Sequence, residues 1–212
     1  MPPTHATQLR NHWWWRPGWN SNRRFYTWHL TFEGQDQLHQ LVTTYHQALH
    51  DVPGLDLIPL QWLHLTMQGI GFTDEVHPDQ AQAIADAAGR RLAELSPVEL
   101  TFHQPVIRPE ALALPPEPVQ AIVTIRDAIR DGVAAVWGDD GVPEIGNRFD
   151  PHLSLAYVNT DGPAKTALEA LTSVTPEPVR VSINEASLII LRRTEHLYRW
   201  DTFSSARLSG KR

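Results

Sequence analysis

The chain has 212 residues, of which 42% are hydrophobic and 20% are charged, and its formal net charge is −6. This length and composition are typical of one large domain or two small lobes with a substantial buried core. The absence of cysteine excludes disulfide bonds and thiolate metal sites. The negative charge argues against a surface that coats nucleic acid, because such surfaces are usually basic.

The sequence also predicts no membrane segment. No apolar run approaches the roughly 20 residues that a helix needs to span a bilayer, and the first residues lack the pattern of a signal peptide. We therefore expect a cytoplasmic protein without a membrane partner, and we take it to be a monomer. Basic residues gather in the range 180–212, where a local positive patch could hold a small anionic substrate.

Residues 1–24 are polar and rich in tryptophan, and they lack a clean period of either 2 or 3.6 residues. We interpret them as an extension of a single domain that spans 25–212. Its tryptophans could stack on a base, but such clusters more often anchor a segment by burial. We prefer burial for all four: Trp13, Trp14, Trp15 and Trp19.

Residues 25–212 alternate between patterns typical of strands and of helices. In chain order we expect a strand at 25–32, a helix at 35–51, strand character at 60–72, a helix at 79–95, a strand at 96–107, a helix at 115–138, a strand at 149–159, a helix at 164–174, strand within 179–193 and a strand at 196–208. Strand, helix, strand thus occurs in both halves. This weak repeat favours an α+β fold with two antiparallel-sheet lobes related by a pseudo-twofold axis, outer helices and a central cleft.

One short pattern occurs three times: WHLTFEG at 28–34, LHLTMQG at 63–69 and PHLSLAY at 151–157. Side chains alternate faces along a strand, so His64 and Thr66 should project together. His152 and Ser154 should do the same, with Tyr157 on the opposite face. His29 obeys the same rule, so alternation alone does not choose among the copies.

The repeat of elements does choose. His64 and His152 each lie on the strand that follows a lobe's first strand and helix, whereas His29 lies before its helix. Two lobes related by a pseudo-twofold axis would bring His64 and His152 face to face across the cleft. We therefore expect His29 to be a structural or cleft-lining residue.

The strings LHLTMQGIG and FDPHLSLAYV, one lobe apart, resemble the paired histidine motifs of the 2H phosphoesterase superfamily, specifically its bacterial 2′-5′ RNA ligase-like branch. The resemblance covers the chain in element order from about residue 25 onward. It implies a bilobal fold with a central cleft and metal-independent cleavage of cyclic or 2′-5′ phosphodiesters. His64 and Thr66 match the first motif, and His152 and Ser154 match the second. Many bacterial members place an arginine where this chain has Tyr157.

Phosphodiester cleavage without a metal needs a base for the incoming oxygen and an acid for the departing one, and histidine can be either near neutral pH. Hydroxyls such as those of Thr66 and Ser154 can donate to the non-bridging oxygens. These four are the candidate catalytic residues. The candidate substrate contacts are Arg148, Tyr157, Arg192 and Arg193.

The expected substrate is a small nucleotide or RNA end that carries a 2′,3′-cyclic phosphate, with 2′-5′ RNA ligation as the reverse activity. A cyclic phosphate of ADP-ribose is a second enzymatic alternative. A non-catalytic RNA-end or nucleotide-binding module that uses the same cleft is the alternative from another class.

Histidines at helical spacing raise one further alternative. His46 and His50 form an i, i+4 pair that could bind zinc, and His39 lies on the same face. No carboxylate or cysteine obviously completes such a site, so we interpret them as a solvated helix face. We expect neither a metal ion nor a cofactor.

Overall fold

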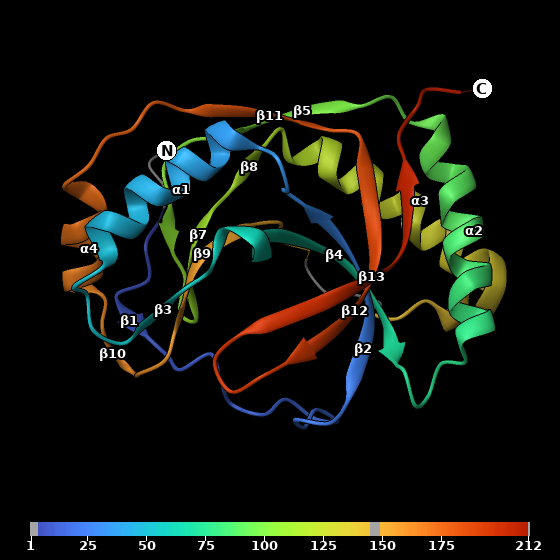
Figure 1. The fold of residues 1–212 in the computed structure, drawn as a ribbon, viewed down its shortest axis with the longest axis horizontal. Coiled ribbons are helices and arrows are strands. Elements are labelled where there is room, and N and C mark those ends of the chain that lie inside the picture. Colours follow the sequence, from blue (N-terminus) through green and yellow to red (C-terminus); the bar gives the residue numbers. More distant parts are fainter. Residues whose placement is uncertain (1–3, 145–148, 212) are drawn as a thin grey trace.

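The computed structural model describes residues 4–144 and 149–211. Two four-stranded antiparallel sheets form its centre (Figure 1). The first, in the order β13-β12-β2-β4, consists of β2 (Arg24–Thr31), β4 (His64–Phe72), β12 (Glu185–Arg193) and β13 (Tyr198–Arg207). The second, in the order β3-β9-β7-β6, consists of β3 (Leu55–Leu57), β6 (Val106–Ile107), β7 (Ala111–Leu114) and β9 (Leu153–Val158).

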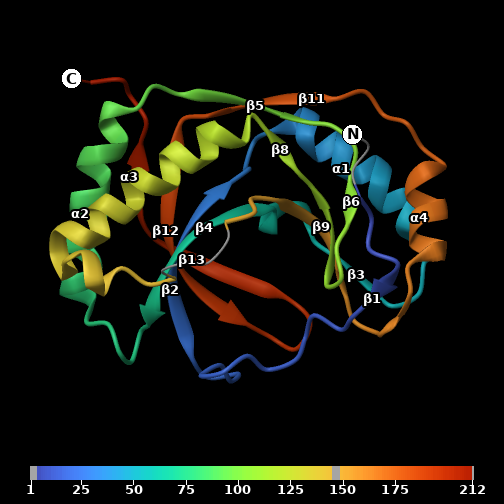
Figure 2. The same ribbon diagram turned by 180° about the vertical axis from the view of Figure 1, so that it is seen from behind.

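Helices cover the outer side of each sheet (Figures 1 and 2). α2 (Pro78–Glu94) and α3 (Val119–Trp137) pack on each other and on β13 and β4 of the first sheet. α1 (Asp36–Leu49) packs on α4 (Lys165–Thr172) and on β9 of the second sheet. None of the helices within residues 4–144 and 149–211 is long and apolar enough to cross a membrane. The α+β fold with two sheet-based lobes and outer helices is confirmed.

Two helices, α1 and α3, pack on the lobe opposite to the one that contains the four-stranded-sheet strand before them in the chain. α1 follows β2 of the first sheet in the chain but packs on the second sheet, and α3 follows β7 of the second sheet but packs on β4 of the first. One face of α1 is buried, as expected of an amphipathic helix; it consists of Leu38, Leu41, Val42, Tyr45 and Leu49. Each half of the sequence therefore contributes to both lobes, and the connections tie the lobes together.

The prediction of one strand at 96–107 is wrong. The range holds β5 (Val98–Phe102) and β6, which belong to different sheets. β5 pairs with β11 (Val179–Ile183) and β8 (Pro116–Glu117) in a third sheet, and β5 and β11 run along the top of both lobes in Figure 1. Because β8 pairs with β5, the helix predicted from residue 115 begins only at Val119.

Short elements complete the fold. β1 (Gln8–Leu9) pairs with β10 (Gly162–Pro163) in a two-stranded sheet. Two 3-10 helices, η1 (Leu60–Trp62) and η2 (Asp139–Gly141), precede β4 and follow α3. The predicted strand at 60–72 is thus a 3-10 turn followed by a strand.

The N-terminal segment, defined as residues 8–24, is attached to both lobes. The Trp13 side chain is buried at 8% exposure, and its Nε1 donates to Asp56 at 2.7 Å. The Arg193 guanidinium donates to the carbonyls of Trp13 and Trp14. Burial is confirmed for Trp13, but it is wrong for Trp14 and Trp15, which are 51% and 47% exposed.

The closest approach of α2 and α3 predicts a stability effect. A methyl group on Gly132 would lie 2.4 Å from the backbone of Ala88, whereas one on Gly89 would lie 3.7 Å from Ala206. We expect Gly132→Ala to destabilise the protein by about 1–3 kcal/mol, because overpacking outweighs the better helix propensity of alanine. Gly89→Ala, the matched control, should be neutral or stabilising by up to about 1 kcal/mol. Urea denaturation measures both changes, and equal effects would contradict this account.

Candidate active site

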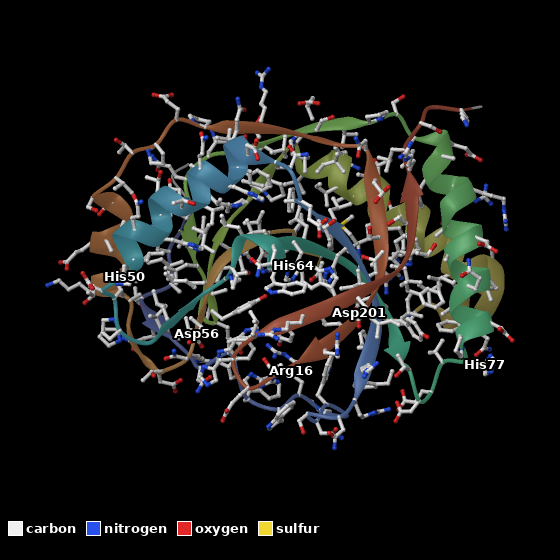
Figure 3. The ribbon with its side chains drawn as sticks, viewed as in Figure 1. Arg16, His50, Asp56, His64, His77 and Asp201 are labelled. Carbon is white, nitrogen blue, oxygen red and sulfur yellow. The ribbon has the colours of Figure 1, made fainter. Side chains whose placement is uncertain are left out.

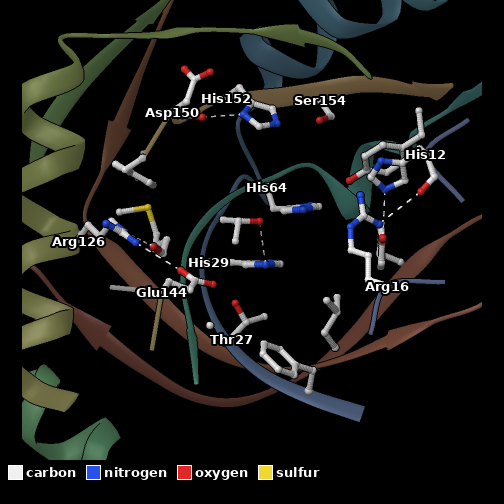
Figure 4. A pocket seen from close by; sticks show the side chains of 18 of the residues that line it. His12, Arg16, Thr27, His29, His64, Arg126, Glu144, Asp150, His152 and Ser154 are labelled. Carbon is white, nitrogen blue, oxygen red and sulfur yellow. Dashed lines mark hydrogen bonds and ion pairs between the residues drawn. The ribbon is translucent and has the colours of Figure 1, made fainter. Parts of the chain in front are cut away.

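A cavity of about 520 Å³ lies between the two four-stranded sheets (Figure 4), within the range of roughly 300–1,000 Å³ that ligand sites occupy. The four residues predicted as catalytic all line it: His64, Thr66, His152 and Ser154. His64 and Thr66 come from β4, whereas His152 directly precedes β9 and Ser154 lies on it. In Figure 3, His64 lies near the middle of the molecule, between the two pairs of helices.

The two histidines have the same hydrogen-bonding pattern. His64 Nδ1 lies 2.8 Å from the carbonyl of Trp62, and His152 Nδ1 lies 2.8 Å from the carbonyl of Asp150. A carbonyl only accepts, so each Nδ1 must carry a hydrogen and donate it. This fixes the tautomer and leaves Nε2 of both rings for a ligand. Figure 4 shows the two rings on different segments of the chain, with His152 above His64 in this view.

Burial keeps both imidazoles neutral at pH 7. Burial lowers the pKa of His64 to about 4; the hydrogen bond to Trp62 opposes this shift, and the proximity of His152 adds to it. Burial also lowers the pKa of His152, and the positive charge of Arg108 acts in the same direction. The effect of His152 on the pKa of His64 agrees with the position of both residues on one cavity. A bound anion would raise both pKa values, because it favours the charged form.

The second sheet places Ser154 and Tyr157 together, and the prediction that they face opposite ways is wrong. Ser154 and Ala156 pair with consecutive residues of β7, which leaves Leu155 without a partner on that strand. Such a bulge breaks the alternation of side chains. Tyr157 consequently lines the same cavity as Ser154.

His29 also lines the cavity, beneath His64. The two rings stack at a centroid distance of 4.3 Å and an interplanar angle of 6°, and His29 is only 1% exposed. Its Nε2 lies 3.4 Å from Thr66 Oγ1. Burial, with a further effect from His64, lowers the pKa of His29 well below its usual value. This is the cleft-lining position expected for the first copy of the motif.

The other predicted contacts lie elsewhere. Arg193 is 3% exposed, and its guanidinium holds the N-terminal segment. Arg192 donates to Asp201 at 2.8 Å, and neither arginine is among the described residues that line the cavity. Arg148 lies outside the described residues.

The prediction that the histidines in and after α1 form a solvated face is wrong for two of the three. His39 and His46 are half-buried, and their Nε2 atoms bond the carbonyls of Phe32 and Leu155. Only His50 is exposed. These two bonds help to fix α1 to the strands beside it.

Sequence reasoning missed the residues at both ends of the cavity. The N-terminal segment supplies His12, Arg16 and Trp19, and Arg126 of α3 lies at the opposite end (Figure 4). Arg126 Nε donates to the carbonyl of Met67 at 2.8 Å. Helical periodicity places Arg126 beside the buried face of α3 but does not show what that face contacts. The N-terminal segment has no period at all.

The comparisons with known proteins agree with this architecture. The model of the 2′-5′ RNA ligase superfamily matches residues 36–195, and the chain belongs to this superfamily of 2H phosphoesterases. No curated protein matched the sequence. The residues of the cavity that precede position 36 lie outside the matched range.

Solved structures share the fold. TT0787 of Thermus thermophilus superposes with a TM-score of 0.66 at 19% identity, over 90% of this chain and 100% of that chain. E. coli LigT complexed with 3′-AMP gives a TM-score of 0.65 at 15% identity, over 89% of this chain and 99% of that chain. E. coli LigT complexed with NADP+ gives 0.61 at 15% identity, over the same shares of the two chains.

Proposed function

We propose that the protein is a metal-independent phosphodiesterase that opens 2′,3′-cyclic phosphates at RNA ends or in related small nucleotides, with 2′-5′ ligation as the reverse activity. The observation that carries this proposal is the pair of identically bonded histidines that line one cavity, one on a strand of the first sheet and the other directly before a strand of the second. Membership of the 2′-5′ RNA ligase superfamily supports a phosphoester substrate. The similar E. coli LigT has been crystallised with phosphate and with nucleotides, which supports the same class of ligand.

The reaction needs one neutral and one charged imidazole. Nε2 of the neutral ring takes a proton from water, and the water oxygen forms a bond to phosphorus. The bond from phosphorus to one ribose oxygen breaks, and Nε2–H of the charged ring gives its proton to that oxygen. In ligation a ribose hydroxyl attacks the cyclic phosphate in place of water, which is the reverse of cleaving a 2′-5′ linkage to that cyclic phosphate. Both rings have Nδ1 bonded to a backbone carbonyl and both line the cavity, so either can be the base. Thr66 and Ser154 donate to the non-bridging oxygens as their negative charge grows.

This mechanism predicts an acidic optimum for kcat/KM, which reports the free enzyme. The base must be neutral and the acid charged, and burial lowers the pKa of His152 below 6.5 and that of His64 to about 4. A bell-shaped profile with its maximum below pH 6.5 should result. The kcat profile should lie at higher pH, because bound phosphate stabilises imidazolium. Steady-state rates across the pH range measure both profiles, and a kcat/KM maximum above pH 7 would contradict the assignment.

The proposal is tested with EDTA-treated protein and a panel of nucleoside 2′,3′-cyclic phosphates. Turnover that persists in EDTA supports it. Turnover that is lost in EDTA and restored by a divalent ion would overturn the metal-independent mechanism. Binding of the cyclic phosphates without turnover would instead favour a nucleotide-binding module.

A further inference from the structure

The N-terminal segment forms one wall of the cavity, and its position is fixed by several side chains. Trp13 is buried and bonded to Asp56, and Arg193 holds the backbone of the segment. Glu110 accepts a second pair of bonds, from Trp14 Nε1 at 3.0 Å and from Arg16 Nη2 at 2.7 Å. These contacts therefore hold Arg16 at the cavity.

Arg16 is the more accessible of the arginines that line the cavity among the described residues, the other being Arg126. The Arg126 side chain is 11% exposed, its Nε is bonded to Met67, and its Nη2 lies 3.4 Å from Glu144. The Arg16 side chain is 33% exposed. Of the five N–H donors of its guanidinium, Glu110 takes one at 2.7 Å and the carbonyl of His12 takes a second at 3.4 Å, so donors are left for an anion.

The surroundings of Arg16 suit an anion. The His12 ring stacks on Tyr157 at 4.1 Å, and its Nε2 lies 3.1 Å from the hydroxyl of Tyr198. Burial lowers the pKa of His12 to about 3, with Arg16 and Arg193 acting in the same direction, so His12 is a neutral spacer. The effect of His152 on His12 shows that this end of the cavity is close to the paired histidines. Arg16 thus brings a permanent positive charge to the end of the cavity that Tyr157 lines.

We propose that Arg16 binds the phosphate on which His64 and His152 act, so that the N-terminal segment completes the substrate site. The identity of that phosphate rests on the proposed function. Tyr157 packs on His12 and Trp13 of the segment that delivers Arg16. A planar guanidinium can donate two parallel hydrogen bonds to a phosphate.

Calorimetric binding of adenosine 3′-monophosphate, compared with adenosine, tests the proposal without any need for turnover. Arg16→Met should raise the Kd for the nucleotide about 10- to 100-fold and leave the Kd for adenosine unchanged. Arg16→Lys keeps the charge but not the fork, so its loss should be smaller. Arg10→Met, an exposed position of the same segment with the same change in net charge, should bind both ligands as the wild type does.

Glu110→Gln separates ligand binding from a merely structural role. A glutamine keeps one carbonyl oxygen, which can accept the bond from Arg16, and the bond from the exposed Trp14 is lost because the second position becomes an NH2 donor. The competing negative charge is gone. We expect the nucleotide to bind several-fold more tightly to this variant. Alternatively, Arg16 only attaches the N-terminal segment to Glu110. Glu110→Gln should then weaken nucleotide binding as Arg16→Met does, and that result would overturn the proposal.

Two further outcomes keep this proposal distinct from the proposed function. A wild-type protein that binds the nucleotide no more tightly than adenosine would overturn the role of Arg16. A protein that turns over no cyclic phosphate, but in which Arg16→Met still weakens nucleotide binding selectively, would refute the proposed activity and support the anion site.

Discussion

His64→Ala and His152→Ala should each lower kcat/KM by about 10²–10⁴-fold, because each removes one half of an acid–base pair. Both rings present Nε2 to the cavity with Nδ1 tied to a carbonyl two residues earlier, so an alanine at either position leaves no substitute. Each variant should also lose one limb of the pH profile. Steady-state kinetics with a nucleoside 2′,3′-cyclic phosphate measure these effects.

His29→Ala is the matched control for these variants. It removes a stacked ring beneath His64 and leaves both proton-transfer atoms in place, so we expect a smaller loss than from either other histidine. His29→Phe keeps a flat ring in the stack and should retain more activity than His29→Ala. A His29→Ala variant as inactive as His64→Ala would show that the first copy of the motif takes part in the chemistry.

Loss of a hydroxyl should have the next largest effect. Thr66→Val and Ser154→Ala should each lower kcat by about 10- to 100-fold with little change in KM, because donors to the phosphate oxygens act mainly as charge develops. Thr66 is exposed to the cavity, and Thr66→Ser keeps its hydroxyl and should remain close to wild type. Parallel measurements of kcat and KM test this, and an effect on KM alone would contradict it.

Much of the secondary structure can be predicted from the local spacing and type of residues. The stripe of α1 follows from its apolar spacing, and β2 and β12 from their branched and aromatic residues. β7 was missed because its four residues, ALAL, have little strand propensity and owe their conformation to pairing with β6 and β9. The sequence also could not predict that α1 and α3 pack on the opposite lobe, because periodicity shows which face of a helix is buried but not which sheet it contacts.

The candidate site divides in the same way. The paired motifs can be found by their spacing and by the strand that each occupies, and the structure places their four side chains around one cavity. The orientation of Tyr157 depends on a bulge at Leu155, and no residue in this strand predicts that bulge. Arg16 reaches the cavity through tertiary contacts of Trp13 and Glu110, and these contacts leave no periodic trace in the sequence.

The most direct test of the central claim, that His64 and His152 act as one unit on a single phosphate, is the activity of the double variant His64→Ala/His152→Ala. Groups that act as a unit are not additive, so its kcat/KM should lie close to that of the weaker single variant. The same substrate and pH must be used for all three variants and the wild type. Losses that multiply, so that the double variant falls a further 10²-fold or more below both single variants, would mean that the histidines act independently and would contradict the account.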